Sequence, residues 1–273
     1  MTRAGLPQSG LRARRRKRRA IYATLGVFTA FIVSAGIVFL SWAPFMRITS
    51  VAISGEHAVA ASAIESVVEG ELAGSYAHLF SRSNVLFYPK GAIEQELFAQ
   101  FPTLASVSAR AQGFHTVNVV VTERQPIALW CGAEIATSSD CFLMDKDGVV
   151  YAPAVIYSSG AYQQYYGAVG GKALPEQYLD SGQFYSLFNL VAAIETKVAT
   201  DTVQTVYVDG NGDAHVQFGS GFTLLFNIGD DSGGILQRFT LALTAAPFLA
   251  HPLSSFEYLD LRFGDKLYYK LKN

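Results

Sequence analysis

The sequence lacks the short motifs that mark most enzymes and metalloproteins. It contains no G-x-S-x-G nucleophile elbow, no P-loop and no Ser-x-x-Lys motif. Its five histidines lie at least 21 residues apart and it has only 2 cysteines, so no local cluster has the spacing of metal ligands. We therefore expect no enzymatic activity, no cofactor, no metal ion and no small-molecule substrate.

Two segments resemble catalytic or metal-binding loops. Gly229–Gly234 is similar to the nucleophile loop of trypsin-like serine proteases. A hydrolase with Ser232 as its nucleophile is therefore a further alternative function. An extra Asp and the absence of a suitably placed His favour a turn before a helix. Asp209–Asp213 matches the first ligand positions of an EF-hand, but Ala214 and Ser220 stand where that loop needs Gly and Glu. A hairpin turn is the better interpretation.

Acidic residues are absent from residues 1–19, and charged residues of either sign are absent from residues 20–46. Ala20–Ala43 would span about 36 Å as a helix, enough for the ~30 Å hydrocarbon core of a membrane. Tyr22 and Trp42 lie near its two ends, where aromatic side chains prefer to lie. We predict a retained transmembrane helix over residues 20–43; a cleaved signal peptide is the alternative.

The basic residues indicate the orientation of the span. Residues 1–19 carry eight Lys or Arg, which predicts a cytoplasmic tail that also contacts anionic lipid, with residues 47–273 outside the cell membrane. This outside portion carries 13 Lys or Arg against all 22 Asp and Glu. It therefore has no basic surface of the kind that binds nucleic acid.

The outside portion divides into two predicted domains, which gives an α+β fold class. Residues 47–124 read as β-α-α-β-β, and residues 125–273 read as a β-rich domain whose helices pack on a mainly antiparallel sheet. In the first domain we expect strands and amphipathic helices at 47–54, 60–72, 91–100, 104–111 and 116–123, in that order.

In the second domain we expect a hairpin over 141–151, a long loop over 158–182, a helix over 186–198, strands at 203–208, 214–218 and 222–227, a helix over 234–246 and two terminal strands around Gly264. Cys131 and Cys141 flank a polar stretch between two short apolar runs. This arrangement favours a disulfide across the mouth of a hairpin in an oxidising compartment. Two buried thiols are the alternative.

Four motifs, read with the order of segments, give the chain a resemblance to a known family. They are ITSVAISG after the span, VVVTERQPIALW at the end of the first domain, CFLMDKDGVVY, and the terminal LDLRFGDKLYYK. The chain resembles the FtsQ/DivIB family of bacterial cell division proteins over residues 20–273. The resemblance implies a single-pass cell membrane protein with a POTRA domain over residues 47–124, a C-terminal β domain, and a location at the division septum. The Cys131/Cys141 pair departs from the family pattern.

The resemblance also implies a non-catalytic divisome scaffold and its partners. These are small bitopic proteins of the FtsB/DivIC and FtsL types, one of which adds a strand to the last strand of the β domain. By position, Arg262 and Phe263 match the family's partner-contacting residues, and Tyr268 lies on the last strand between Lys266 and Lys270. These lysines could select an acidic partner, or simply prevent edge-to-edge aggregation. A POTRA-bearing component of envelope assembly or translocation is the alternative function.

Overall fold

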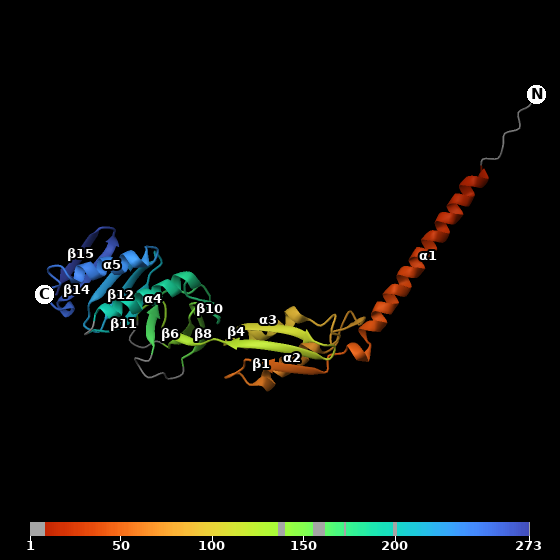
Figure 1. Ribbon diagram of the computed structural model, residues 1–273, viewed down its shortest axis with the longest axis horizontal. Helices are drawn as coiled ribbons and strands as arrows, with labels where there is room; N and C mark the ends of the chain where they lie inside the picture. Colours follow the sequence, from red (N-terminus) through yellow and green to blue (C-terminus); the bar gives the residue numbers. More distant parts are fainter. Residues whose placement is uncertain (1–8, 136–139, 155–161, 172, 199–200, 273) are drawn as a thin grey trace, which may run out of the picture. The chain divides into compact units, whose positions relative to one another are not determined.

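The computed structural model describes residues 9–135, 140–154, 162–171, 173–198 and 201–272 (Figure 1). The chain divides into two compact units, residues 1–123 and residues 124–273, and each contains helices and strands. The α+β fold class is therefore confirmed. Residues 1–8 of the basic tail lie outside the described residues.

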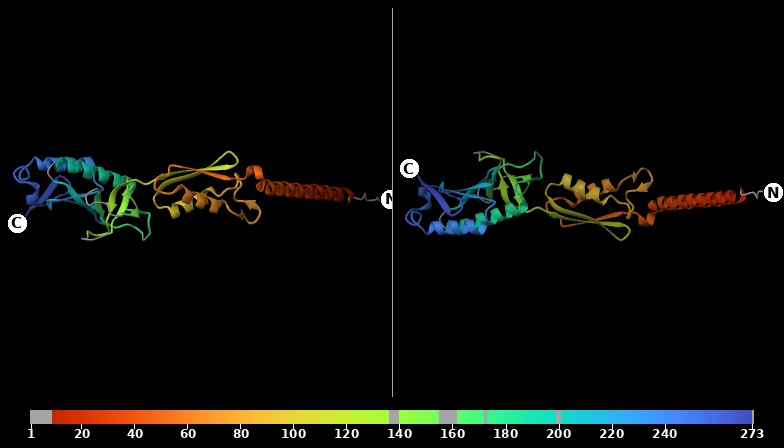
Figure 2. Two further views of the ribbon diagram at one scale, coloured as in Figure 1. Left: turned by 90° about the horizontal axis from the view of Figure 1, so that it is seen from below. Right: turned by 90° about the horizontal axis from the view of Figure 1, so that it is seen from above.

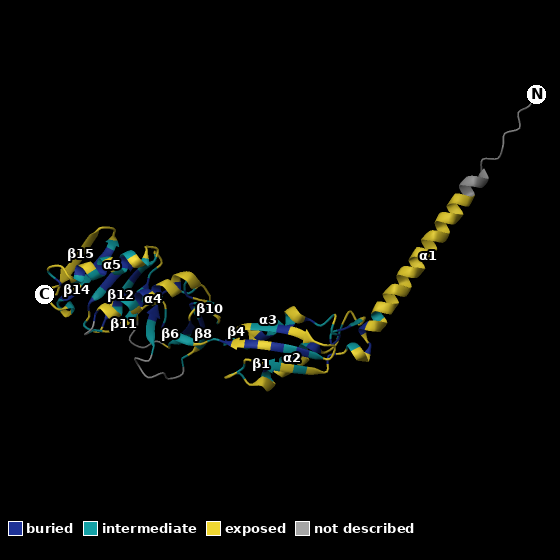
Figure 3. Cartoon of the chain, viewed as in Figure 1, coloured by how far each residue is buried: buried dark blue, intermediate teal, exposed yellow. Residues whose placement is uncertain are grey.

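The first helix, α1 (Ser9–Ser41), is long and apolar enough to cross a membrane over Arg14–Ser41, and no other described helix is. Its described side chains are exposed almost throughout, as the yellow colour in Figure 3 shows. A short 3-10 helix, η1 (Pro44–Met46), follows at the predicted helix stop. An apolar helix of this length with no protein covering it is what a membrane span requires.

The rest of the first unit is a small sheet with two helices on one face. Its elements are β1 (Ser50–Ser54), α2 (Ala61–Leu72), the short hairpin β2 (Ser75–Tyr76) and β3 (Phe80–Ser81), α3 (Lys90–Gln100), β4 (Leu104–Gln112) and β5 (Thr116–Glu123). The described strands of the main sheet have the order β1-β5-β4, with β1 parallel and β4 antiparallel to β5.

Alternation along β5 explains why this sheet buries one face. Val117, Val119 and Val121 are buried, and they pack with Ile64 of α2 and Ile93 of α3 in one core. Because side chains alternate along a strand, this face is fixed by every second residue. The valines on β5 thus place both helices on the same side of the sheet.

The second unit is built on one large sheet. Its strands are β6 (Pro126–Trp130), β7 (Phe142–Asp145), β8 (Val149–Pro153), β9 (Gln163–Tyr166), β10 (Glu176–Gln177), β11 (Val203–Val208), β12 (Asp213–Phe218), β13 (Thr223–Asn227), β14 (Phe256–Phe263) and β15 (Lys266–Leu271). The described strands follow the order β10-β8-β7-β6-β9-β11-β12-β13-β14-β15. Six of these nine pairings are antiparallel and three are parallel.

Helices α4 (Ser181–Lys197) and α5 (Ser232–Leu243) cover one face of this sheet, as both views in Figure 2 show. Phe184 from α4 and Phe239 from α5 are fully buried in the same core as Phe226 of β13 and Phe256 of β14. A 3-10 turn, η2 (Leu253–Ser255), leads into β14. The opposite face of β11–β15 carries no described helix.

The predicted loop over residues 158–182 is wrong where its described part contains β9, β10 and the first two residues of α4. Residues 163–166 form β9, which lies between β6 and β11 and pairs with both in parallel. The sequence Gln-Gln-Tyr-Tyr has no apolar alternation, so its position depends on non-local pairing that periodicity does not report. Residues 158–161 and 172 of the predicted loop lie outside the described residues.

The start of the helix predicted at 186–198 is also corrected. Helix α4 begins at Ser181, because the Asp180 carboxylate caps it by accepting the N–H of Gly182 at 3.0 Å. An Asp directly before the first turn is a strong N-cap signal. Gly182 and Gln183 are not apolar, so hydrophobic periodicity did not predict this first turn.

Candidate partner-binding site

The last strand, β15, forms one edge of the large sheet. It pairs with β14 on one side, and none of the described strands pairs with it on the other. All six of its residues are exposed (Figure 3). A strand edge in this state presents unpaired backbone N–H and C=O groups, and such an edge is a template for an incoming strand.

The pairing with β14 determines which backbone groups face outward. The N–H of Lys272 donates to Ser255 O at 2.9 Å. Backbone groups of successive residues alternate in direction along an antiparallel strand. Residues 268 and 270 therefore bond to β14, as Lys272 does, while Leu267, Tyr269 and Leu271 direct their N–H and C=O groups away from the sheet.

The two faces of β15 differ in character. Tyr269 lies on the helix-covered face, where its ring contacts Phe256 at 6.0 Å and Phe248 at 5.6 Å between centroids. Leu267 and Leu271 share that face by alternation. The opposite face carries Lys266, Tyr268 and Lys270. The strand thus combines an apolar face with a basic and aromatic face.

Arg262 lies beside this strand, on β14, and it is held by the protein itself. Its Nε and Nη2 atoms donate to the two carboxylate oxygens of Asp260 at 2.9 and 2.6 Å, and its Nη1 donates to Asp213 Oδ2 at 2.7 Å. Asp260 is buried, with 5 % of its surface exposed. The predicted contact residue is therefore the centre of an ion cluster with two carboxylates, while 30 % of its side chain stays exposed.

The ion cluster shifts the pKa values of its members. Burial alone would raise the pKa of Asp260, but the hydrogen bonds from Arg262 outweigh burial and lower it. Hydrogen bonds from Asn227 and then Arg262 lower the pKa of Asp213. Both carboxylates raise the pKa of Arg262. All three groups therefore stay charged at neutral pH, and their hydrogen bonds link β12 to β14 across β13.

Phe263 and Tyr268 form the exposed aromatic part of the site. Their rings meet edge to face at 5.1 Å between centroids, and the guanidinium of Arg262 lies 5.8 Å from the Phe263 ring. A hollow on this face is lined by Leu225, Tyr258, Asp260, Arg262, Phe263 and Tyr268. Exposed aromatic rings next to a hollow are typical anchors of protein interfaces.

The two predicted lysines differ in their surroundings. Lys270 forms an ion pair with Glu257 at 2.6 Å, and this hydrogen bond raises the pKa of Lys270. Lys266 is exposed at the start of the strand. All five predicted residues thus lie together on β14 and β15, with Arg262 buried furthest into the protein.

Sequence reasoning missed the residues that hold Arg262. Asp260 could have been found, because it lies two residues before Arg262 on the same face of the strand. Asp213 is 49 residues away in sequence, and it had been interpreted only as part of a turn. Its role depends on the β12-β13-β14 order of the sheet.

The two enzyme-like and metal-like loops have structural roles in the chain as described. Ser232 is the first residue of α5, and the Asp231 carboxylate caps that helix by accepting the N–H of Gly234 at 2.7 Å. The carboxylate of Asp209 closes the β11–β12 turn by accepting the N–H of Asp213 at 2.9 Å. Among the described residues, no group of three His, Cys, Asp or Glu side chains could hold a metal ion.

A disulfide and an ion pair support the start of the second unit. Cys131 and Cys141 are joined, with Cα atoms 4.1 Å apart, where β6 ends and β7 begins. At the other end of the same hairpin, Arg124 pairs with the buried Asp145. Residues 136–139, within the polar stretch between the cysteines, lie outside the described residues.

Compared with protein-family models and with curated proteins, the chain finds no match.

Proposed function

We propose that this chain is a single-pass membrane protein of the FtsQ/DivIB type, a non-catalytic scaffold of the bacterial division septum. In this proposal residues 1–19 lie in the cytoplasm and both folded parts lie outside the cell membrane. The first unit after the span acts as a POTRA domain. The second unit binds small bitopic division proteins of the FtsB/DivIC and FtsL types.

The element order supports the domain part of the proposal. The first unit runs β1-α2-α3-β4-β5, apart from the short β2–β3 hairpin, with both helices on one face of its sheet. This matches the β-α-α-β-β order expected of a POTRA domain. The apolar α1, with the basic tail before it, supports the orientation.

The observation that carries the binding proposal is the edge position of β15. Its outward backbone groups, at Leu267, Tyr269 and Leu271, offer a ladder of donors and acceptors to one incoming strand. Main-chain hydrogen bonds of this kind supply affinity, while the side chains on the two faces supply specificity.

The faces of β15 define the partner strand by its chemistry. Partner residues opposite Leu267, Tyr269 and Leu271 would lie on the helix-covered face and should be apolar. Those opposite Tyr268 and Lys270 would lie on the other face, where acidic and aromatic side chains fit best. We expect the partner to supply an extended segment in which apolar and acidic or aromatic residues alternate.

The experiment separates backbone pairing from side-chain contact. Leu267→Pro removes an outward N–H and leaves the bonds to β14 intact, whereas Leu267→Ala removes only the side chain. A photo-crosslinking amino acid at Tyr268 or Phe263 then reports the partner in dividing cells. We expect crosslinks to a small bitopic protein in the parent chain and in Leu267→Ala, and their loss in Leu267→Pro.

Two outcomes would contradict the proposal. Undiminished crosslinking in Leu267→Pro would show that the edge is not the docking route. A uniform envelope signal from an N-terminal fluorescent fusion, in place of septal bands, would favour envelope assembly over division. Circular dichroism of each variant checks that the sheet is retained.

A further inference from the structure

Exposed apolar side chains gather at one end of the first unit. Among the described residues between 42 and 123, five large apolar side chains are at least half exposed: Trp42 at 54 %, Phe45 at 58 %, Leu79 at 50 %, Leu86 at 62 % and Phe114 at 59 %. They come from four separate segments, namely the end of α1 with η1, the β2–β3 hairpin, the turn after β3 and the β4–β5 turn.

Hydrogen bonds tie two of these segments to the end of α1. The indole N–H of Trp42 donates to Leu79 O at 2.9 Å, and the N–H of Val85 donates to Met46 O at 2.9 Å, directly before Leu86. Three further bonds link the same segments: Ser81 N–H to Ser41 Oγ at 2.8 Å, and Asn84 Nδ2 to Leu40 O at 3.3 Å and to Ser41 O at 3.1 Å. These bonds hold the β2–β3 hairpin and the turn after β3 beside the C-terminal end of α1.

The β4–β5 turn joins them through His115. Its carbonyl oxygen accepts the N–H groups of Thr49 at 2.8 Å and Ser50 at 3.0 Å, and its Nδ1 lies 3.0 Å from Arg47 O. Phe114, the neighbouring residue, is consequently held beside the segment that follows η1. We call the five side chains Trp42, Phe45, Leu79, Leu86 and Phe114 the membrane-proximal collar.

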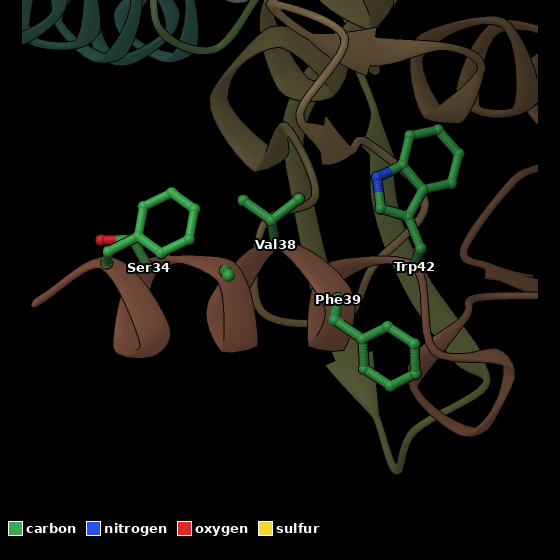
Figure 4. Close-up of a pocket in the computed structure, with 6 residues that line it drawn as sticks. Ser34, Val38, Phe39 and Trp42 are labelled. Carbon is green, nitrogen blue, oxygen red and sulfur yellow. The ribbon is translucent and has the colours of Figure 1, made fainter. Parts of the chain in front are cut away.

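The length of the apolar helix gives the depth of this collar. A hydrocarbon core of ~30 Å takes about 20 helical residues, which from Ala20 reaches Phe39. Trp42 and the segments bonded to it then fall in the headgroup region, where Trp and other amphipathic side chains prefer to lie. On the N-terminal side of Trp42, the surface of α1 has a mainly apolar hollow whose lining includes Val38 and Phe39. Val38 and Trp42 project from the same side of the helix (Figure 4).

Charge also favours lipid as the occupant. The segments 41–50, 74–90 and 112–116 contain Arg47, Arg82 and Lys90 and no Asp or Glu, and Arg82 and Lys90 pair with Glu71 of α2 and Glu94 of α3. The outside portion as a whole carries 13 Lys or Arg against 22 Asp or Glu, so this end departs from the acidic remainder. A surface of exposed apolar side chains whose own segments contribute no acidic residue matches the headgroup region of a membrane.

We infer that the membrane-proximal collar is embedded in the outer headgroup region of the bilayer. The first unit is then held on the membrane by several segments in addition to its span. The inference rests on the membrane span of the proposed function, and it assigns the β2–β3 hairpin and the β4–β5 turn a lipid-binding role.

The test uses the full chain in lipid nanodiscs without reductant. Cys131 and Cys141 then stay joined, so only an introduced cysteine reacts with the fluorophore bimane. Single cysteines replace Leu79, Leu86 or Phe114, and the lipids carry a nitroxide quencher either near the headgroup or deep in the acyl chain.

Two further cysteine variants serve as references. Val120→Cys is a matched control, because Val120 is 45 % exposed and lies on the same unit. It is four residues beyond Thr116 along β5, which is about 14 Å further from the collar end. Ile32→Cys, near the middle of residues 20–43, reports the span itself.

We expect the headgroup quencher to act several-fold more strongly on the three collar labels than on the label at Val120, and the deep quencher to act on Ile32 alone. Equal quenching at the collar and at Val120, with Ile32 still quenched, would overturn the collar and leave the span intact. An unquenched Ile32 would overturn the span, and with it both the topology of the proposed function and the collar.

Discussion

Replacing Arg262 should destabilise the second unit even without a partner, because its guanidinium holds two carboxylates that would otherwise repel each other. It makes three charge-assisted hydrogen bonds, two to Asp260 and one to Asp213. Removing one member of a buried ion pair costs ~3–5 kcal/mol. Since the Arg262 side chain is 30 % exposed and water can partly replace it, we expect Arg262→Ala to lower the free energy of unfolding by about 3 kcal/mol.

The assay is urea unfolding of the full chain in detergent, followed by Trp130 fluorescence in a Trp42→Phe background. The indole of Trp130 is bonded to Gly167 O at 2.9 Å, so its emission reports the second unit. Arg262→Ala should lower the urea midpoint by about 1.5 M if the slope is ~2 kcal/mol per M. Adding Asp260→Asn to the Arg262→Ala variant should restore part of the lost free energy of unfolding, because it removes the carboxylate charge that Arg262 no longer neutralises.

The pH dependence gives a second check on the same prediction. The pKa values of Asp260 and Asp213 are lowered in the folded chain, so the ion cluster stabilises it above the unfolded pKa of about 3.9. That contribution is lost as the pH falls through the folded pKa values. The difference between the parent chain and Arg262→Ala should therefore narrow in acid. A loss below about 1 kcal/mol, or a difference that does not change with pH, would refute the role assigned to the cluster.

Three further predictions concern stability. Glu123→Gln should lower hydrogen-exchange protection of the three amides that its carboxylate binds, by about 2 kcal/mol at neutral pH. Burial would raise the pKa of Glu123 but these donors lower it, so the effect should disappear as the pH falls through that pKa. Gly55→Ala should destabilise the first unit by at least ~2 kcal/mol in urea unfolding, because its Cβ would lie 2.1 Å from a backbone oxygen of β5 and its φ is +91°. Its matched control Gly70→Ala, which meets nothing within 4 Å in α2, should be neutral or stabilising by up to ~1 kcal/mol. Replacing both Cys131 and Cys141 with Ser should lower the free energy of unfolding of the second unit by about 3 kcal/mol, measured as a lower urea midpoint. An unchanged midpoint would contradict this.

Local periodicity predicted the elements that carry their own signal. The valines of β5 and the apolar stripe of α2 gave their positions directly, because each pattern matches the period of the element it forms. The hairpin of β7 and β8 followed from a four-residue turn between apolar runs. Strand β9 has no such signal, and its place in the middle of the sheet depends on partners that are distant in sequence.

In the candidate site too, features with a local sequence signal could be predicted, and features that depend on distant residues could not. That β15 is a strand beside β14 could be predicted from alternation around Gly264, and its residues do lie together. The capture of Arg262 by Asp213 could not, because it needs the sheet order β12-β13-β14. Arg262 was interpreted only as a contact residue, whereas the structure shows that its guanidinium also links β14 to β12. Its contact with a partner stays a prediction.

The basic side chains along the outer edge have a consequence for the behaviour of the protein at high concentration. If two copies paired antiparallel through their outward groups about Tyr269, Lys266 of each copy would face Lys272 of the other on the same side of the ribbon. Like charges placed opposite each other disfavour such self-association, whereas an acidic strand meets no such obstacle. Salt screens this repulsion, so the purified chain should stay monomeric in dilute buffer and begin to dimerise as the ionic strength rises.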